Sequence, residues 1–94
     1  MKRLDYKKIG FIEMLKWVEE NKEVLQNERA KELKNFMDII VDVKGRKGTN
    51  QAKPIFRKLA EGYVEFDNLP QGKTVKVDEG MELYKKLRAE LGMD

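Results

Sequence analysis

A run of basic residues near the middle of the chain has the chemistry to bind phosphate. From residue 43 to residue 60 there is no Asp or Glu, although acidic residues are frequent on both sides of this segment. Gly45 and Gly48 flank two of its cations, and glycine allows a backbone to approach a phosphate closely. Because positive charge gathered in one part of a chain attracts polyanions, the segment predicts a nucleic-acid partner. Its six cations are Lys44, Arg46, Lys47, Lys53, Arg57 and Lys58.

Uncharged hydrogen-bond donors accompany these cations. Side-chain amides and hydroxyls can contact base edges or phosphates, and the predicted helix that follows them offers free N–H groups at its N-terminus. We expect binding with little sequence preference, and to DNA rather than RNA. Two alternatives remain: a solvated loop that only aids solubility, or docking on an acidic protein surface. The further residues predicted to contact nucleic acid are Thr49, Asn50, Gln51, Lys73 and Lys76.

The residue types that are absent from the chain narrow the possible chemistry. The sequence contains neither Cys nor His, which excludes thiolate zinc sites and cysteine nucleophiles and removes the commonest general base. The stretch GRKGTNQAK does not have the glycine and lysine spacing of a nucleotide-hydrolysing loop. The spacing of Asp67, Asp78 and Glu79 matches no calcium loop. We therefore expect a protein that is not an enzyme and that holds no metal or cofactor.

Four helical patterns would position these residues. Apolar residues at helical spacing predict helices over residues 6–25 and 28–43. Residues 38–43 also alternate like a strand, so that helix and strand both stay open for them. A short basic helix is expected over residues 50–60, with Pro54 in its first turn, where its missing N–H costs nothing. A last helix is expected over residues 78–91.

Two short alternating segments, 63–67 and 73–77, predict strands joined by a turn at Pro70 and Gly72. The expected fold is therefore α+β in a single domain that spans residues 1–94. It consists of a helical hairpin, the short basic helix, a two-stranded antiparallel β-hairpin and a C-terminal helix.

This order of elements resembles two nucleic-acid-binding families. A short helix followed by a basic hairpin resembles the second half of a winged helix-turn-helix domain, although Pro54 is uncommon in a recognition helix. That resemblance implies that Gln51, Lys53 and Arg57 face DNA. As an alternative, the stretch GRKG with the elements up to residue 91 resembles a KH domain, whose G-x-x-G loop clamps a nucleotide backbone.

Trp17 lies apart from the apolar stripe of the first predicted helix, between Glu13 and Val24 on a helical wheel. Either the helix packs on two sides and Trp17 belongs to a wider core, or Trp17 is an exposed anchor for a protein partner or for a second copy in a homodimer. No apolar run approaches the roughly 18 residues that a membrane-spanning helix needs, and the N-terminus lacks a signal-peptide pattern. We expect a cytoplasmic protein without a membrane partner.

Overall fold

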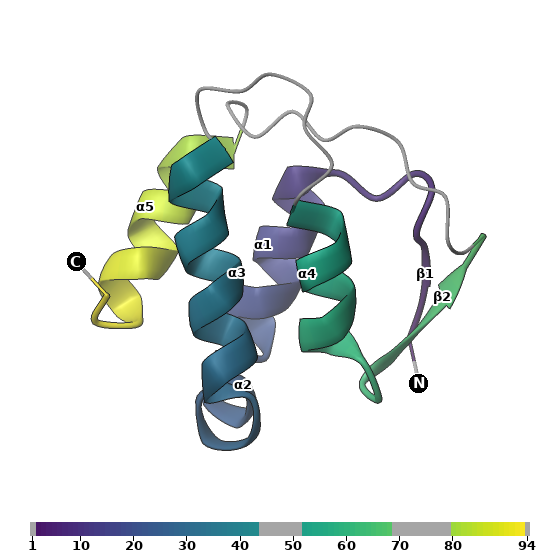
Figure 1. Ribbon diagram of the computed structural model, residues 1–94, viewed down its shortest axis with the longest axis horizontal. Coiled ribbons are helices and arrows are strands. Elements are labelled where there is room, and N and C mark those ends of the chain that lie inside the picture. Colours follow the sequence, from purple (N-terminus) through teal and green to yellow (C-terminus); the bar gives the residue numbers. More distant parts are fainter. Residues whose placement is uncertain (1, 44–51, 69–79, 94) are drawn as a thin grey trace.

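The computed structural model describes residues 2–43, 52–68 and 80–93, in which helices and strands occur together (Figure 1). The α+β class is therefore confirmed, but the chain begins with a strand that was not predicted. The elements are β1 Lys2–Asp5, α1 Phe11–Glu20, α2 Lys22–Glu28, α3 Ala30–Val43, α4 Ala52–Ala60, β2 Val64–Asp67 and α5 Met81–Glu90.

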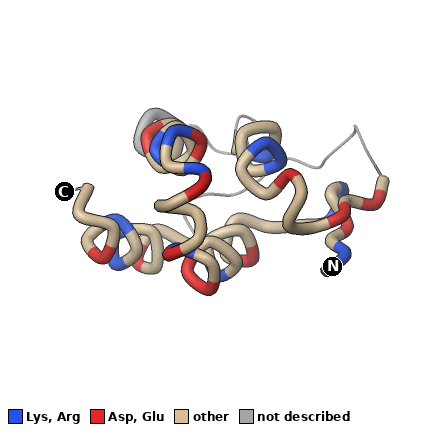
Figure 2. Tube along the Cα trace, turned by 90° about the horizontal axis from the view of Figure 1, so that it is seen from below, with Lys and Arg blue, Asp and Glu red and all other residues tan. Residues whose placement is uncertain are grey.

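The longer helices form two layers. Helices α3 and α4 lie side by side in one layer, and α1 and α5 lie side by side in the other (Figures 1 and 2). Phe56 of α4 is at the centre of the core between them. Its ring centroid lies 5.5 Å from that of Trp17, 5.8 Å from that of Phe36 and 6.0 Å from that of Phe66. Burying a side chain of this size contributes about 1.5–3 kcal/mol to folding.

The first predicted helix is interrupted at Asn21. Helix α1 ends at Glu20 and α2 begins at Lys22, while Asn21 itself has φ −117° and ψ 13°. The Asn21 side-chain Nδ2 donates a hydrogen bond to the carbonyl of Trp17 at 2.8 Å. An Asn side chain that bonds to the preceding turn in this way competes with helix continuation.

The other predicted helices are confirmed. Helix α3 runs through residues 38–43, so the helical alternative for that stretch is right and the strand is wrong. Pro54 lies in the first turn of α4, as expected, and Gly62 follows the helix with φ +89°, which favours glycine. The Arg29 guanidinium donates to the carbonyls of Lys58 and Glu61, which satisfies the free end of α4.

The pairing of the strands differs from the prediction. Strand β2 pairs with β1, and the two are parallel, with Lys2 opposite Val64 and Asp5 opposite Asp67. The expected antiparallel pairing is therefore wrong for β2, whose partner comes from the start of the chain. The second strand of the predicted hairpin, 73–77, and its turn lie outside the described residues. Because that strand is not described, the winged-helix order stays a prediction.

Candidate nucleic-acid interface

The predicted interface is only partly within the described residues. Lys53, Arg57 and Lys58 belong to α4. The basic segment 44–51 connects the end of α3 to the start of α4, and these two helix ends lie at the same end of the molecule (Figure 1). The other predicted contacts lie outside the described residues: Lys44, Arg46, Lys47, Thr49, Asn50, Gln51, Lys73 and Lys76.

Lys53 is buried, with only 1% of its surface exposed. Its Nζ donates to the backbone carbonyls of Tyr6 and Lys7, at 3.2 Å each, and lies 5.9 Å from the centroid of the Tyr6 ring. A buried ammonium needs such acceptors, because removing a charge from water is costly. The structure thus contradicts the expectation that Lys53 faces DNA.

The burial of Lys53 has a signal in the sequence. Lys53 precedes Phe56 by three residues and Ala60 by seven, and this spacing places it on the same side of a helix as those two residues. Both are fully buried. A helical wheel of α4 therefore places Lys53 toward the core, although its charge alone suggests the surface.

Arg57 and Lys58 are exposed, and neither forms an ion pair with a carboxylate of the described residues. They leave α4 in different directions, because consecutive helical residues are about 100° apart. Arg57 lies one turn after Lys53, on the side of α4 that meets Tyr6. Burial raises the pKa of Tyr6, and the charge of nearby Arg57 opposes this rise. Arg57 and Lys53 therefore lie on the same side of α4.

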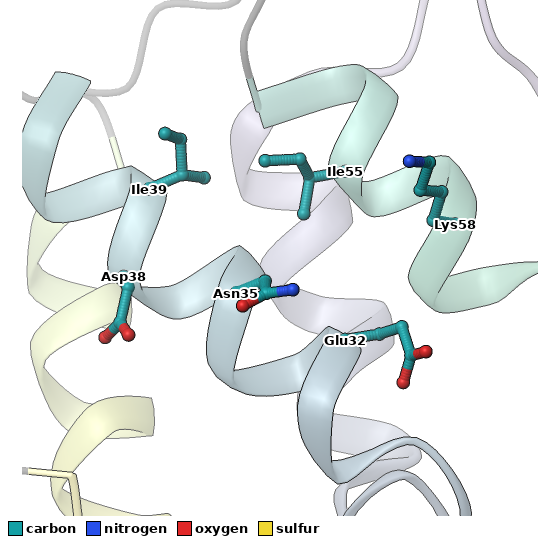
Figure 3. A pocket seen from close by; sticks show the side chains of 6 residues that line it. All are labelled: Glu32, Asn35, Asp38, Ile39, Ile55 and Lys58. Carbon is teal, nitrogen blue, oxygen red and sulfur yellow. The ribbon is translucent and has the colours of Figure 1, made fainter.

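Lys58 lies on the other side of α4, beside a groove of about 370 Å³ between α3 and α4 (Figure 3). Ile39 and Ile55 face each other across this groove. The Glu32 carboxylate lies on the α3 side (Figure 3) and would repel a phosphate backbone that entered the groove, whereas the Asp38 carboxylate is paired with Lys34 at 2.7 Å. The interior of the groove is therefore unsuitable for a phosphate backbone, whereas Lys58 is exposed and stays a candidate for a phosphate contact outside it. Its lining residues are Glu32, Asn35, Asp38, Ile39, Ile55 and Lys58.

Two exposed cations in the turn after β1 were missed by the sequence analysis. Lys7 and Lys8 follow Tyr6, and neither forms an ion pair with a carboxylate of the described residues. Asp5 shapes the turn: its carboxylate accepts a hydrogen bond from the backbone N–H of Lys7 at 3.0 Å and another from Asn68 at 2.9 Å. The bond from Asn68 is the main reason why the pKa of Asp5 lies below its usual value.

Trp17 is buried, with 5% of its surface exposed. Its ring packs against Phe56 on α4 and lies 6.3 Å, centroid to centroid, from the ring of Tyr63. The interpretation of Trp17 as part of a wider core is therefore confirmed, and the exposed anchor is wrong. A protein partner or a homodimer that depends on an exposed Trp17 loses its basis.

The described residues contain no candidate metal site, and no similar protein adds information about this interface. Within the described ranges, no three His, Cys, Asp or Glu side chains are gathered so that they could hold a metal ion. No helix in the described part of the chain has the length and apolar character needed to span a membrane. No protein-family model, curated protein or solved structure matches the chain.

Proposed function

We propose that the protein binds nucleic acid, DNA in preference to RNA, with little sequence preference and without catalysing a reaction. The observation that carries this proposal is the acid-free basic run of residues 43–60. Segment 44–51 joins α3 to α4, two helices that pack side by side, and the exposed Arg57 and Lys58 of α4 belong to the same basic run. The absence of His and Cys from the sequence supports a binding role rather than a catalytic one.

Phosphate contacts would supply most of the affinity. With Lys53 buried, five cations of the basic run remain as candidates for such contacts. Thr49, Asn50 and Gln51 would add uncharged donors, and Lys73 and Lys76 would add charge from the segment before α5. Neutralising about five phosphates releases their counterions, and it predicts a slope near about −4.5 for log affinity against log salt concentration. The five cations are Lys44, Arg46, Lys47, Arg57 and Lys58.

The decisive experiment reverses two charges of the basic segment. Arg46→Glu combined with Lys47→Glu should abolish binding to labelled random duplexes, measured by fluorescence anisotropy over a series of salt concentrations. The matched control is Lys31→Glu with Lys85→Glu, which changes the net charge equally at exposed positions on α3 and α5. Unchanged affinity of the Arg46/Lys47 variant for both duplex and single strands would reject the proposal.

The same cations would also attract an acidic protein surface, which is the second candidate function. Affinity purification from a cytoplasmic extract, with and without nuclease, separates the two. Bound material that disappears after nuclease treatment indicates nucleic acid. A defined protein that stays bound after nuclease treatment and is lost in the Arg46/Lys47 variant favours the acidic partner.

A further inference from the structure

A buried lysine joins the N-terminal turn to the basic helix. The two carbonyls that accept hydrogen bonds from Lys53 Nζ belong to consecutive residues, Tyr6 and Lys7, and the Tyr6 ring lies beside the same ammonium. One side chain from the first turn of α4 therefore holds the backbone of residues 6–7 in place. Because this contact is buried, water could not readily take the place of the ammonium or of the carbonyls if either were removed.

The contact holds the turn that carries Lys7 and Lys8 against the first turn of α4, the helix that carries Arg57. Lys7 and Lys8 project from the held turn and are exposed, and Arg57 is exposed one helical turn after Lys53. Tyr6 lies close enough to Arg57 for the charge of Arg57 to act on its hydroxyl. The basic segment 44–51 joins α4 at Ala52, the residue before Lys53. The N-terminal turn therefore meets the first turn of α4 at Lys53.

We infer that Lys53 is a positioning residue whose ammonium holds Lys7 and Lys8 beside Arg57, so that these two lysines extend the phosphate-binding surface. The inference rests on the proposed function and adds a second segment of the chain to it. The Asp5 carboxylate lies in the same turn, where it accepts hydrogen bonds from the Lys7 backbone N–H and from Asn68, and the charge of Lys8 acts on it as a minor cause of its lowered pKa. Neither Lys7 nor Lys8 forms an ion pair with a carboxylate of the described residues, so both exposed ammonium groups can also meet an external anion.

The first test removes the two charges without disturbing the core. Lys7→Gln with Lys8→Gln should make the salt slope for duplex DNA less steep by about 1.8, because each phosphate contact contributes about 0.9. The control Lys16→Gln with Lys31→Gln removes the same net charge from exposed positions on α1 and α3 and should leave the slope unchanged. An unchanged slope in the Lys7/Lys8 variant, with wild-type protein that still binds, overturns the inference and leaves the proposed function standing.

The second test asks whether Lys53 acts through the turn. Lys53→Met keeps a long side chain but removes the ammonium, so hydrogen exchange at the amides of residues 7–9 should rise and the salt slope should change as it does in the Lys7/Lys8 variant. Added to that variant, Lys53→Met should have no further effect on the slope. A further loss in the combined variant indicates general destabilisation and overturns the positioning role.

The two failures are distinguishable. Wild-type protein that binds neither duplex nor single strands overturns the proposed function and the phosphate role of Lys7 and Lys8 together. The hydrogen-exchange result then still decides whether Lys53 holds the turn. If Lys53→Met does not fold, Lys7→Gln with Lys8→Gln alone decides whether the turn belongs to the binding surface.

Discussion

Trp17 and Phe56 meet edge to face, with an interplanar angle of 88°, where α1 packs beneath α4. Such an aromatic pair contributes about 0.5–1.5 kcal/mol beyond the burial of its surface. The pair joins the two layers, since Trp17 belongs to α1 and Phe56 to α4. Trp17 is therefore part of the core, although it lies apart from the apolar stripe of the first predicted helix.

Replacing Trp17 with Ala should lower the free energy of unfolding by about 3–5 kcal/mol, because it leaves a cavity against Phe56. Chemical denaturation followed by far-ultraviolet circular dichroism measures this loss. The control is Ile12→Ala on the same helix: Ile12 is 38% exposed, so its truncation should cost only about 0.5 kcal/mol. Equal costs at the two positions would contradict the buried placement of Trp17.

For single residues, the position on a helical wheel predicted burial better than the charge of the side chain did. Lys53 was assigned to the surface because of its ammonium, whereas its spacing from Phe56 placed it on the buried side of α4. What the sequence could not provide was the acceptor pair, because the carbonyls of Tyr6 and Lys7 come from a segment 46 or 47 residues earlier in the chain. Only the tertiary fold brings these groups together.

At the scale of the elements, helices with a clear apolar periodicity were predictable. The exceptions have physical causes that apolar periodicity does not show. Asn21 breaks the first predicted helix through its own side chain, an interaction that apolar spacing does not reveal. Strand β1, with the sequence KRLD, is short and largely polar, so it has no alternation to detect. It pairs with β2 through the parallel backbone ladder, and Arg3 adds exposed ion pairs with Glu65 and Asp67.

The start of α5 meets the start of α1 without room for another atom. A Cβ at Gly80 would lie 2.7 Å from Cδ2 and 3.0 Å from Cε2 of Phe11, whose ring is buried. Gly80→Ala should therefore lower the free energy of unfolding by about 1–3 kcal/mol. Thermal and chemical denaturation of the purified variant measure this change.

The smaller Phe11→Leu side chain provides the matched test of that contact. In a Phe11→Leu background, Gly80→Ala should cost clearly less than in the wild type, because the new methyl group no longer meets the ring. An equal cost in both backgrounds would show that the clash with Phe11 is not the cause.

At the scale of the whole molecule, ion pairs connect elements that are far apart in the sequence. Lys22 at the start of α2 pairs with Glu90 at the end of α5, and Asp38 of α3 lies between Lys34 and Arg88. Hydrogen bonds from Lys22 and from Lys34 are the main causes that hold the pKa values of Glu90 and Asp38 below their usual 4.5 and 3.8.

These lowered pKa values give stability a definite acid dependence. The contribution of each carboxylate is present above its ordinary pKa and is lost as the pH falls through the lower pKa of the folded state. Urea denaturation at a series of acidic pH values should therefore show decreasing stability, and Glu90→Gln should make this decrease shallower. Lys22→Met should have the same effect, because it removes the partner. If both variants keep the wild-type pH dependence, the Lys22–Glu90 pair makes no such contribution.

The parallel ladder has a consequence for the order of events in folding. Its cross-strand ion pair joins Arg3 to Glu65, 62 residues apart in the chain, and contacts at such separation close only after the intervening chain has become compact. In refolding followed by pulsed hydrogen–deuterium labelling, the amides of α3 and α4 should gain protection first, and those of β1 and β2 last. Until β2 and α4 have folded, β1 has no strand to pair with, and the turn that carries Lys7 and Lys8 is not held by Lys53.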